Sequence, residues 1–79
     1  MAIASMIVQP AANSLQQVAE QLAFVNGVTV HSTKSNQEII IVVEAPSLDA
    51  ISAVARTIEA ISGVLSVLPA YVTVADEDN

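Results

Sequence analysis

Hydrophobic residues recur with a helical period in two segments of this chain, 14–26 and 48–62. Within each segment they follow the spacing i, i+3, i+7 and i+10, which gathers them on one face of a helix. These positions are Leu15, Val18, Leu22 and Val25 in the first segment, and Ile51, Val54, Ile58 and Ile61 in the second. A glycine follows each segment, at Gly27 and Gly63, where a helix commonly ends in a left-handed turn. The pattern predicts two amphipathic helices.

The two helical segments belong to an internal repeat in which equivalent residues lie 36 positions apart. The same offset aligns Pro10 with Pro46 and Gly27 with Gly63, so the two halves share their breaks as well as their hydrophobic positions. Each half is therefore expected to form one structural unit.

Runs rich in β-branched residues flank each helix, at 3–9 and 28–32 in the first half and at 38–44 and 64–74 in the second. The polar segment 33–37 is predicted to form a hairpin turn between the second and third strands. The element order is βαββαβ, which is typical of the ferredoxin-like α+β fold, a four-stranded antiparallel sheet with both helices on one face. We predict one such domain over residues 1–74 and an acidic, disordered tail at 75–79.

The polar positions of each strand indicate which side of the sheet the helices leave uncovered, because alternate side chains point to opposite sides. On the third strand, Glu38 and Glu44 indicate the solvent side. The same side carries Ile40 and Val42, and the opposite side is expected to face the core.

The 36-residue offset carries the assignment of the third strand to the first strand, and alternation within each strand assigns the second and fourth. On the first strand the offset directs Ile3, Ser5 and Ile7 to the core and leaves Ala4, Met6 and Val8 uncovered. Outward positions on the second and fourth strands are Thr29, His31, Ser66, Leu68 and Ala70. The uncovered side would then carry an apolar strip with an ionisable rim. The strip is Met6, Val8, Ile40, Val42 and Leu68, and the rim is Glu38, Glu44 and His31.

A monomeric protein rarely leaves an apolar strip of this kind bare. One structural explanation is that β-branched residues favour central strands, and a second is that the strip buries itself in a homodimer. The functional explanation is a platform that binds a helix or strand of another chain. The pattern alone leaves all three open.

The composition excludes most catalytic functions. The 79 residues include no cysteine and one histidine, so the chain lacks thiolate chemistry, disulfides and the ligands of an ordinary transition-metal site. With only two glycines it has no phosphate-binding glycine-rich loop, and no serine has a recognisable histidine and acid partner. We therefore predict a binding protein without cofactors rather than an enzyme.

The charge of the chain restricts its partners. A net charge of -6, with Lys34 and Arg56 as the only fixed cations, disfavours nucleic acid and favours a cationic partner such as a basic peptide. The first residues lack the charged start of a secretory signal, and no apolar run approaches the ~18 residues of a membrane span. We expect a cytoplasmic protein that is not inserted in a membrane.

Four segments resemble the NapD family in their order, spacing and total length, over residues 3–71. They are 5–9, 27–30, 40–45 and 63–67. The resemblance implies a cytoplasmic chaperone for the twin-arginine signal peptide of NapA, the molybdenum-containing catalytic subunit of periplasmic nitrate reductase. It implies that export is delayed until the cofactor is loaded, and that the peptide binds as a helix on the open side of the sheet.

On this resemblance, the expected signal-peptide site is Ala4, Met6, Val8, His31, Glu38, Ile40, Val42, Glu44 and Leu68. The two glutamates would meet the arginines, and the strip would cover the apolar turns. The chain departs from the family at Ala2 and Val72, where members often carry histidine, so no role of those histidines is transferred. A small-molecule-sensing regulatory domain and a dimerisation domain of the same fold remain the alternatives.

Overall fold

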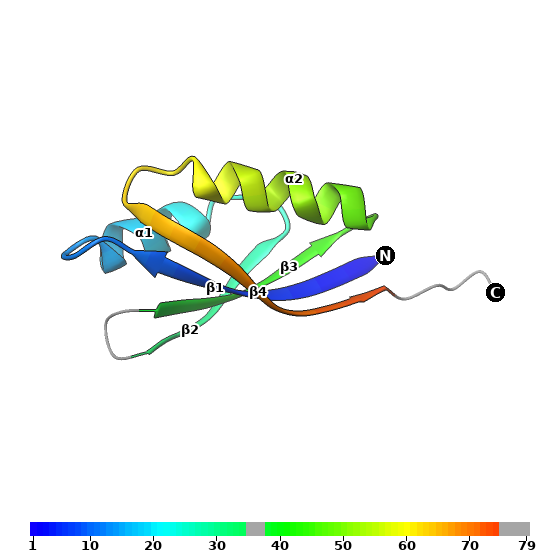
Figure 1. Ribbon diagram of the computed structural model, residues 1–79, viewed down its shortest axis with the longest axis horizontal. Coiled ribbons are helices and arrows are strands. Elements are labelled where there is room, and N and C mark those ends of the chain that lie inside the picture. Colours follow the sequence, from blue (N-terminus) through cyan, green and yellow to red (C-terminus); the bar gives the residue numbers. More distant parts are fainter. Residues whose placement is uncertain (35–37, 75–79) are drawn as a thin grey trace.

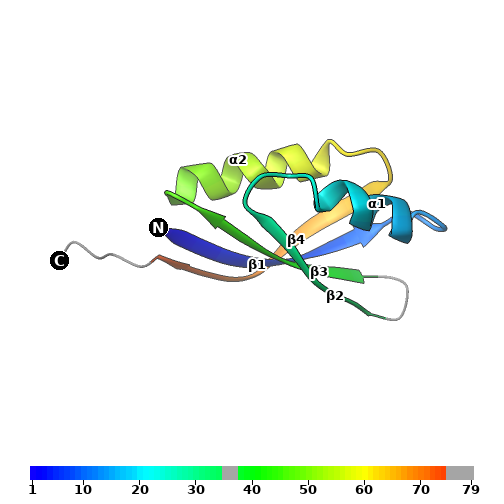
Figure 2. The same cartoon turned by 180° about the vertical axis from the view of Figure 1, so that it is seen from behind.

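The computed structural model describes residues 1–34 and 38–74, and its elements follow the order βαββαβ (Figure 1). They are β1 (Ala2–Pro10), α1 (Leu15–Leu22), β2 (Val28–Lys34), β3 (Glu38–Ala45), α2 (Leu48–Glu59) and β4 (Val64–Val74). The strands form one antiparallel sheet in the order β2-β3-β1-β4, and both helices lie on the same side of it (Figures 1 and 2). The predicted ferredoxin-like fold is confirmed. The expected acidic tail and residues 35–37 of the expected hairpin turn lie outside the described residues.

Both helices end earlier than their hydrophobic period suggests. After Leu22 the chain continues in tight i to i+3 turns, in which the Val25 amide donates to the Leu22 carbonyl at 3.0 Å. The Ile61 amide donates to the Ile58 carbonyl in the same way after α2, also at 3.0 Å. Val25 and Ile61 therefore belong to these turns rather than to helix. No helix in the described ranges is long and apolar enough to cross a membrane.

Gly27 shows why a glycine is needed where the chain returns to the sheet. Its φ is 84°, in the left-handed region, and its carbonyl accepts a 2.8 Å hydrogen bond from the Glu44 amide. A Cβ built at this position would lie 2.5 Å from the Glu44 carbonyl oxygen. A side chain would therefore separate the start of β2 from the end of β3.

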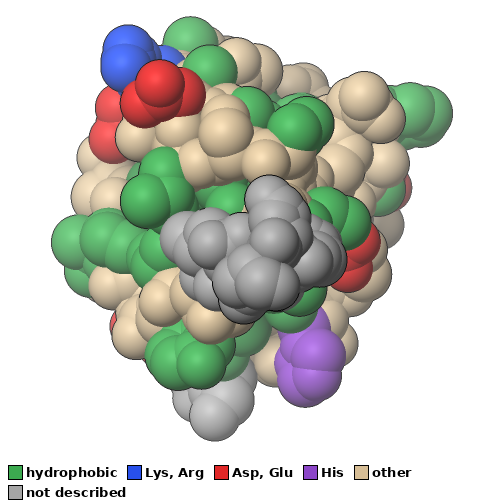
Figure 3. Space-filling model, turned by 90° about the vertical axis from the view of Figure 1, so that its right-hand side faces the viewer, with side chains coloured by type: hydrophobic (Ala, Val, Ile, Leu, Met, Phe, Trp, Pro, Cys, Tyr) green, Lys and Arg blue, Asp and Glu red, His purple; other side chains and the backbone are tan. Residues whose placement is uncertain are grey.

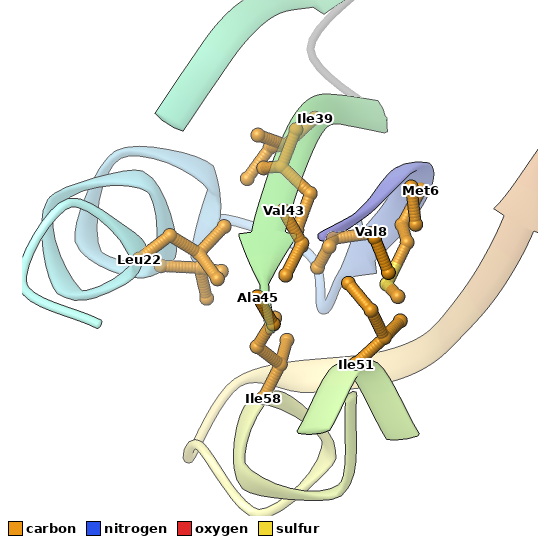
Figure 4. Close-up of a cluster of buried hydrophobic side chains, with 12 residues drawn as sticks. Met6, Val8, Leu22, Ile39, Val43, Ala45, Ile51 and Ile58 are labelled. Atoms are coloured by element: carbon orange, nitrogen blue, oxygen red, sulfur yellow. The ribbon is translucent and has the colours of Figure 1, made fainter. Parts of the chain in front are cut away.

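The core lies between the sheet and the two helices. Val18 and Leu22 of α1 are buried, and so are Ile51 and Ile58 of α2. Figure 4 shows Leu22, Ile51 and Ile58 directed toward the side chains of β1 and β3. The helix faces were therefore predicted correctly, although Leu15 and Val54 pack at the margin and are only half-buried. On β3, Ile39, Ile41 and Val43 are fully buried as predicted.

The prediction for β1 was wrong, because the strand presents the opposite set of side chains to the helices. Ala4, Met6 and Val8 are 0%, 3% and 0% exposed, whereas they were expected on the uncovered side. In the register, Met6 lies opposite Ile41 and Val8 opposite Ile39, and cross-strand partners share a face. Figure 4 shows Met6 and Val8 within the cluster that also contains Val43 and Ile51.

The cause of this error is the connection between β1 and α1. It spans residues 11–14, whereas the equivalent connection from β3 to α2 spans only 46–47. The first connection also contains Asn13 in the left-handed conformation, with φ 64°. Leu22 and Ile58, which are buried at equivalent helix positions, are 36 residues apart, whereas the buried strand residues Val8 and Val43 and the strand ends Pro10 and Ala45 are 35 apart, so the helix offset is one residue out for the strands. A slip of one residue moves every side chain of a strand to its other face.

The position of Leu22 generates a direct stability test. Leu22→Ala should lower the free energy of unfolding by about 2–5 kcal/mol, because the truncation leaves a cavity in a closed part of the core. Phe24→Ala is the matched control: Phe24 is 88% exposed two positions further on, and its loss should change stability by less than about 0.5 kcal/mol. Urea denaturation of both variants gives the comparison, and equal effects would contradict the assigned helix face.

Candidate functional site

The side of the sheet opposite the helices is uncovered, and we call it the open face. Its side chains form rows across the strands, because residues opposite each other in the register share a side. The apolar row is Leu68, Ile7 and Ile40. The central row is Tyr71, Ser5, Val42 and Thr29. The acidic row is Thr73, Ile3 and Glu44. Successive rows lie two residues, or roughly 7 Å, apart along the strands.

The apolar side chains of these rows form a nearly continuous surface from β4 to β3. At the β4 side, Leu68 is 47% exposed and Tyr71 is 63% exposed. In the central strands, Ile7, Ile40 and Val42 are half-buried by their neighbours within the sheet. Ser5 supplies a hydroxyl in the middle of this surface. The open face can therefore contact an apolar segment over several strands at once.

The structure places most of the predicted site residues on this face and removes three. Glu38, Ile40, Val42 and Glu44 lie on it, as does Leu68. The three residues removed, Ala4, Met6 and Val8, belong to the core described above. The positions that sequence reasoning missed are Ile3, Ile7 and Tyr71. On β1, Ile3 and Ile7 thus replace Met6 and Val8 in the apolar strip, and Tyr71 of β4 is added to it.

The polar residues of β1 already indicated which of its side chains face solvent. Ser5 and Gln9 are its polar residues, and they share one side by the same alternation that was applied to β3. In the structure the Ser66 hydroxyl donates a 2.7 Å hydrogen bond to Gln9 Oε1. This contact places Ser66 beside Gln9 at the edge of the open face, beyond the apolar row.

His31 lies at a bulge in β2. The register passes from Val30 opposite Ile41 to Ser32 opposite Ile40, so His31 has no partner residue of its own. Its side chain is exposed, and its Nδ1 lies 3.4 Å from the Ser32 hydroxyl oxygen. The imidazole is therefore available at the rim of the open face, next to the apolar row.

Strand β4 follows the expected outward pattern only in part. Ser66 and Leu68 face outward as predicted, opposite Gln9 and Ile7. The register then shifts between Ser5 and Met6, so that Ala70 is the extra residue and Tyr71 takes the outward position in the central row. The bulge follows Pro69, which cannot donate a ladder hydrogen bond.

Hollows adjoin the sheet in the part of the chain that the structure describes. A groove of about 400 Å³ lies between α2 and β4, on the helix side, and its walls include Leu48, Ala55 and Val72 with Glu59 as the charged member. A shallower hollow of about 470 Å³ lies where β1 begins and β3 ends. It is lined by Met1, Gly27, Glu44, Ala45 and Pro46. Only the second hollow contains a residue of the open face.

The charged groups around the open face are few and separated. Figure 3 views the molecule from the end where β1 begins, and it shows patches of hydrophobic side chains and a few separate acidic ones. Within the described ranges, no group of three or more histidine, aspartate or glutamate side chains could hold a metal ion. What the face offers chemically is non-covalent contact with an amphipathic, cationic segment.

Comparison with known proteins places this arrangement in a family. A family model described as NapD protein matches residues 1–76. The solution structure titled the E. coli Tat proofreading chaperone protein NapD superposes with a TM-score of 0.81 at 23% sequence identity, and the match covers 98% of this chain and 81% of that chain. A search of curated proteins finds no match. At this identity the structural likeness demonstrates the shared fold.

The corrected faces of β1 predict opposite results for two neighbouring substitutions. Met6→Glu places a carboxylate in the core and should lower the free energy of unfolding by several kcal/mol, or abolish folding. Ile7→Glu places the same carboxylate on the open face, where water can hydrate it, and should leave a folded domain. Circular dichroism with thermal melting of both variants checks this, and the reverse order of stabilities would overturn the register of β1.

Proposed function

Because this chain belongs to the NapD family of chaperones, we propose that its open face binds the twin-arginine signal peptide of a NapA-like periplasmic nitrate reductase in the cytoplasm. The family is one of chaperones rather than of enzymes. The observation that carries the assignment to this face is the uncovered apolar surface of the apolar and central rows, with Glu44 in the row beyond it.

A signal peptide has the complementary chemistry. It begins with cationic residues and continues as an apolar stretch, which can form a helix with one side on a hydrophobic surface. The apolar row would contact the apolar turns, and a carboxylate of the open face would bind a guanidinium group through a charge-assisted hydrogen bond. The net charge of -6 attracts such a peptide over longer distances and raises the encounter rate at low salt.

The energy available from this face suits reversible binding. Removing ~400 Å² of apolar surface from water at ~25 cal/mol per Å² contributes about 10 kcal/mol before any costs. Association and the ordering of the peptide helix offset a large part of this gain, since association alone costs about 4–15 kcal/mol. Hydrophobic contact alone therefore supplies at most about 6 kcal/mol of net binding free energy, so the charge-assisted hydrogen bonds have to add to it and the complex remains reversible.

Retention of the peptide explains how a binder without catalytic groups can act in enzyme maturation. While the signal peptide lies on the open face, it is withheld from export. Release would follow once the client has folded around its molybdenum cofactor. In this scheme the client alone carries the cofactor, and the chaperone supplies only the surface that binds the signal peptide.

Val42 lies in the central row of the open face, so substituting it tests directly whether this face binds the peptide. Val42→Glu should abolish binding of a synthetic twin-arginine peptide while leaving the domain folded. The carboxylate is hydrated in the free protein, but the apolar turns of the peptide would bury it without a partner. Isothermal titration calorimetry measures the binding, and the methyl and amide NMR spectrum reports the fold.

The matched control is Ala53→Glu, which adds the same charge to an exposed position of α2 on the other side of the sheet. This control should bind the peptide within about twofold of the parent. If Val42→Glu binds as well as Ala53→Glu, the open face is not the site. Mass measurement by light scattering on the same samples distinguishes a second explanation, because a homodimer through this face would become monomeric in Val42→Glu.

A further inference from the structure

We propose that the outer edge of β4 pairs with the same edge of a second copy of this chain, so that two copies form a symmetric dimer with one continuous sheet. This contact goes beyond the proposed peptide site, because it uses the edge of the sheet and leaves both open faces uncovered. The inference derives from the place of β4 at the end of the sheet, its exposed apolar side chains and its lack of charge.

Strand β4 is the outermost strand beside β1, and its other edge faces away from the sheet (Figure 1). Its 11 residues include large apolar side chains that are exposed, namely Leu65, Leu68, Tyr71 and Val72. The strand at the opposite edge, β2, has seven residues and is broken by the bulge at His31. Proteins usually protect a long edge strand with charged side chains, and β4 has none. A long, apolar edge of this kind is a site of strand pairing.

The charge of the chain favours a second copy as the partner of this edge. The net charge is -6, but no residue from Val64 to Val74 is charged. Two copies can therefore meet along β4 without placing like charges opposite each other. A cationic peptide would find no carboxylate on this strand, in contrast to the rim of the open face. Because antiparallel pairing of two identical strands is self-complementary, the edge fits a dimer with two-fold symmetry.

One antiparallel register matches the two copies on both sides of the joined sheet. It sets Leu68 opposite Tyr71 of the second copy, and it then sets Val67 opposite Val72. Leu68 and Tyr71 both lie on the open face. Val67 and Val72 both lie on the helix side, since their β1 partners are buried in the core. Each pair therefore joins side chains of the same face, and the helices of both copies lie on one side of the joined sheet.

The backbone groups fit the same register. Successive residues of a strand direct their N–H and C=O groups to its two edges in alternation. The β1 partners of Leu68 and Tyr71 are two positions apart on that strand, so these two residues direct their groups to the same edge. Val67 and Val72 flank them and direct their groups to the other edge. Both pairs thus consist of residues of one class, as an antiparallel ladder requires.

The irregular middle of β4 lies at the two-fold axis in this register. Pro69 of one copy is opposite Ala70 of the other. Pro69 has no N–H to donate, and Ala70 is the extra residue of the bulge, so the ladder rests on the two arms, 64–68 and 71–74. A contact made by one strand of each copy is small beside the roughly 1,200–2,000 Å² of a stable interface. The dimer is therefore weak, and its population depends on concentration.

Sedimentation of the full chain between about 10 μM and about 1 mM tests the dimer. The average mass of the parent should rise from monomer toward dimer over this range. Val72→Glu should weaken the association by about tenfold or more, because it sets a carboxylate without a partner against Val67 of the second copy. Leu68→Glu should act in the same way from the open face. Circular dichroism checks the fold of both variants, whose substituted side chains are exposed in the monomer.

Phe24→Glu is the matched control for these variants. Phe24 is exposed and lies outside β4, and its substitution gives the same net charge as Val72→Glu. It should leave the association constant within about twofold of the parent. Equal association in the two variants, or a parent that stays monomeric at the highest concentration, would overturn the inference. So would a dimer that is lost in Val42→Glu and kept in Val72→Glu, because that dimer would use the open face.

Disulfide formation tests the register. The chain has no cysteine, so each single substitution reports one position. Leu68→Cys mixed with Tyr71→Cys should form the mixed disulfide faster than either variant links to itself, because only the two different positions lie opposite each other. Preferential self-linking of either variant would overturn the register and this inference with it. Peptide binding is measured separately, so the proposed function stands or fails by its own titration.

Discussion

The pairing of β1 with both of its neighbours is the constraint on which the two sides of the sheet depend. Met6 opposite Ile41 and Val8 opposite Ile39 bring one set of side chains under the helices. The same pairing brings Ile7 between Ile40 and Leu68 on the other side. Core and open face are thus two consequences of one register. A slip by one residue would bury Ser5 and expose Met6, so packing against the helices also maintains the composition of the open face.

The open face is apolar in the middle and acidic at its ends. The middle of a central strand favours β-branched residues, and the ends of β3 are exposed to water. Ile40 and Val42 are β-branched and suit a pleated strand between two neighbours, whereas Glu38 and Glu44 keep the ends of that strand hydrated. Most monomeric domains would leave a more polar surface on an uncovered sheet. The apolar rows are therefore better explained by a partner that covers them than by the stability of the isolated domain.

The sequence was sufficient to predict the element order, the helix faces and the sides of β3, because each depends on a local period or on charged residues within the same element. It was insufficient for β1, where the prediction depended on an offset carried across a connection whose length differs between the halves. Ser5 and Gln9 would have corrected it, since they mark the solvent side within the strand. Tyr71 was missed for a different reason, because the bulge at Ala70 breaks the alternation and no local pattern reports the position of a bulge.

Methyl NMR of the protein titrated with a twin-arginine signal peptide tests most directly whether the open face binds the peptide. The prediction is that the largest shift changes and peptide contacts fall on Ile3, Ile7, Ile40, Val42 and Leu68, while the methyl groups of Val18 and Ile58 in the core respond weakly. Contacts concentrated instead on Leu48, Ala55 and Val72 would place the peptide in the groove between α2 and β4 and would contradict the assignment of the open face.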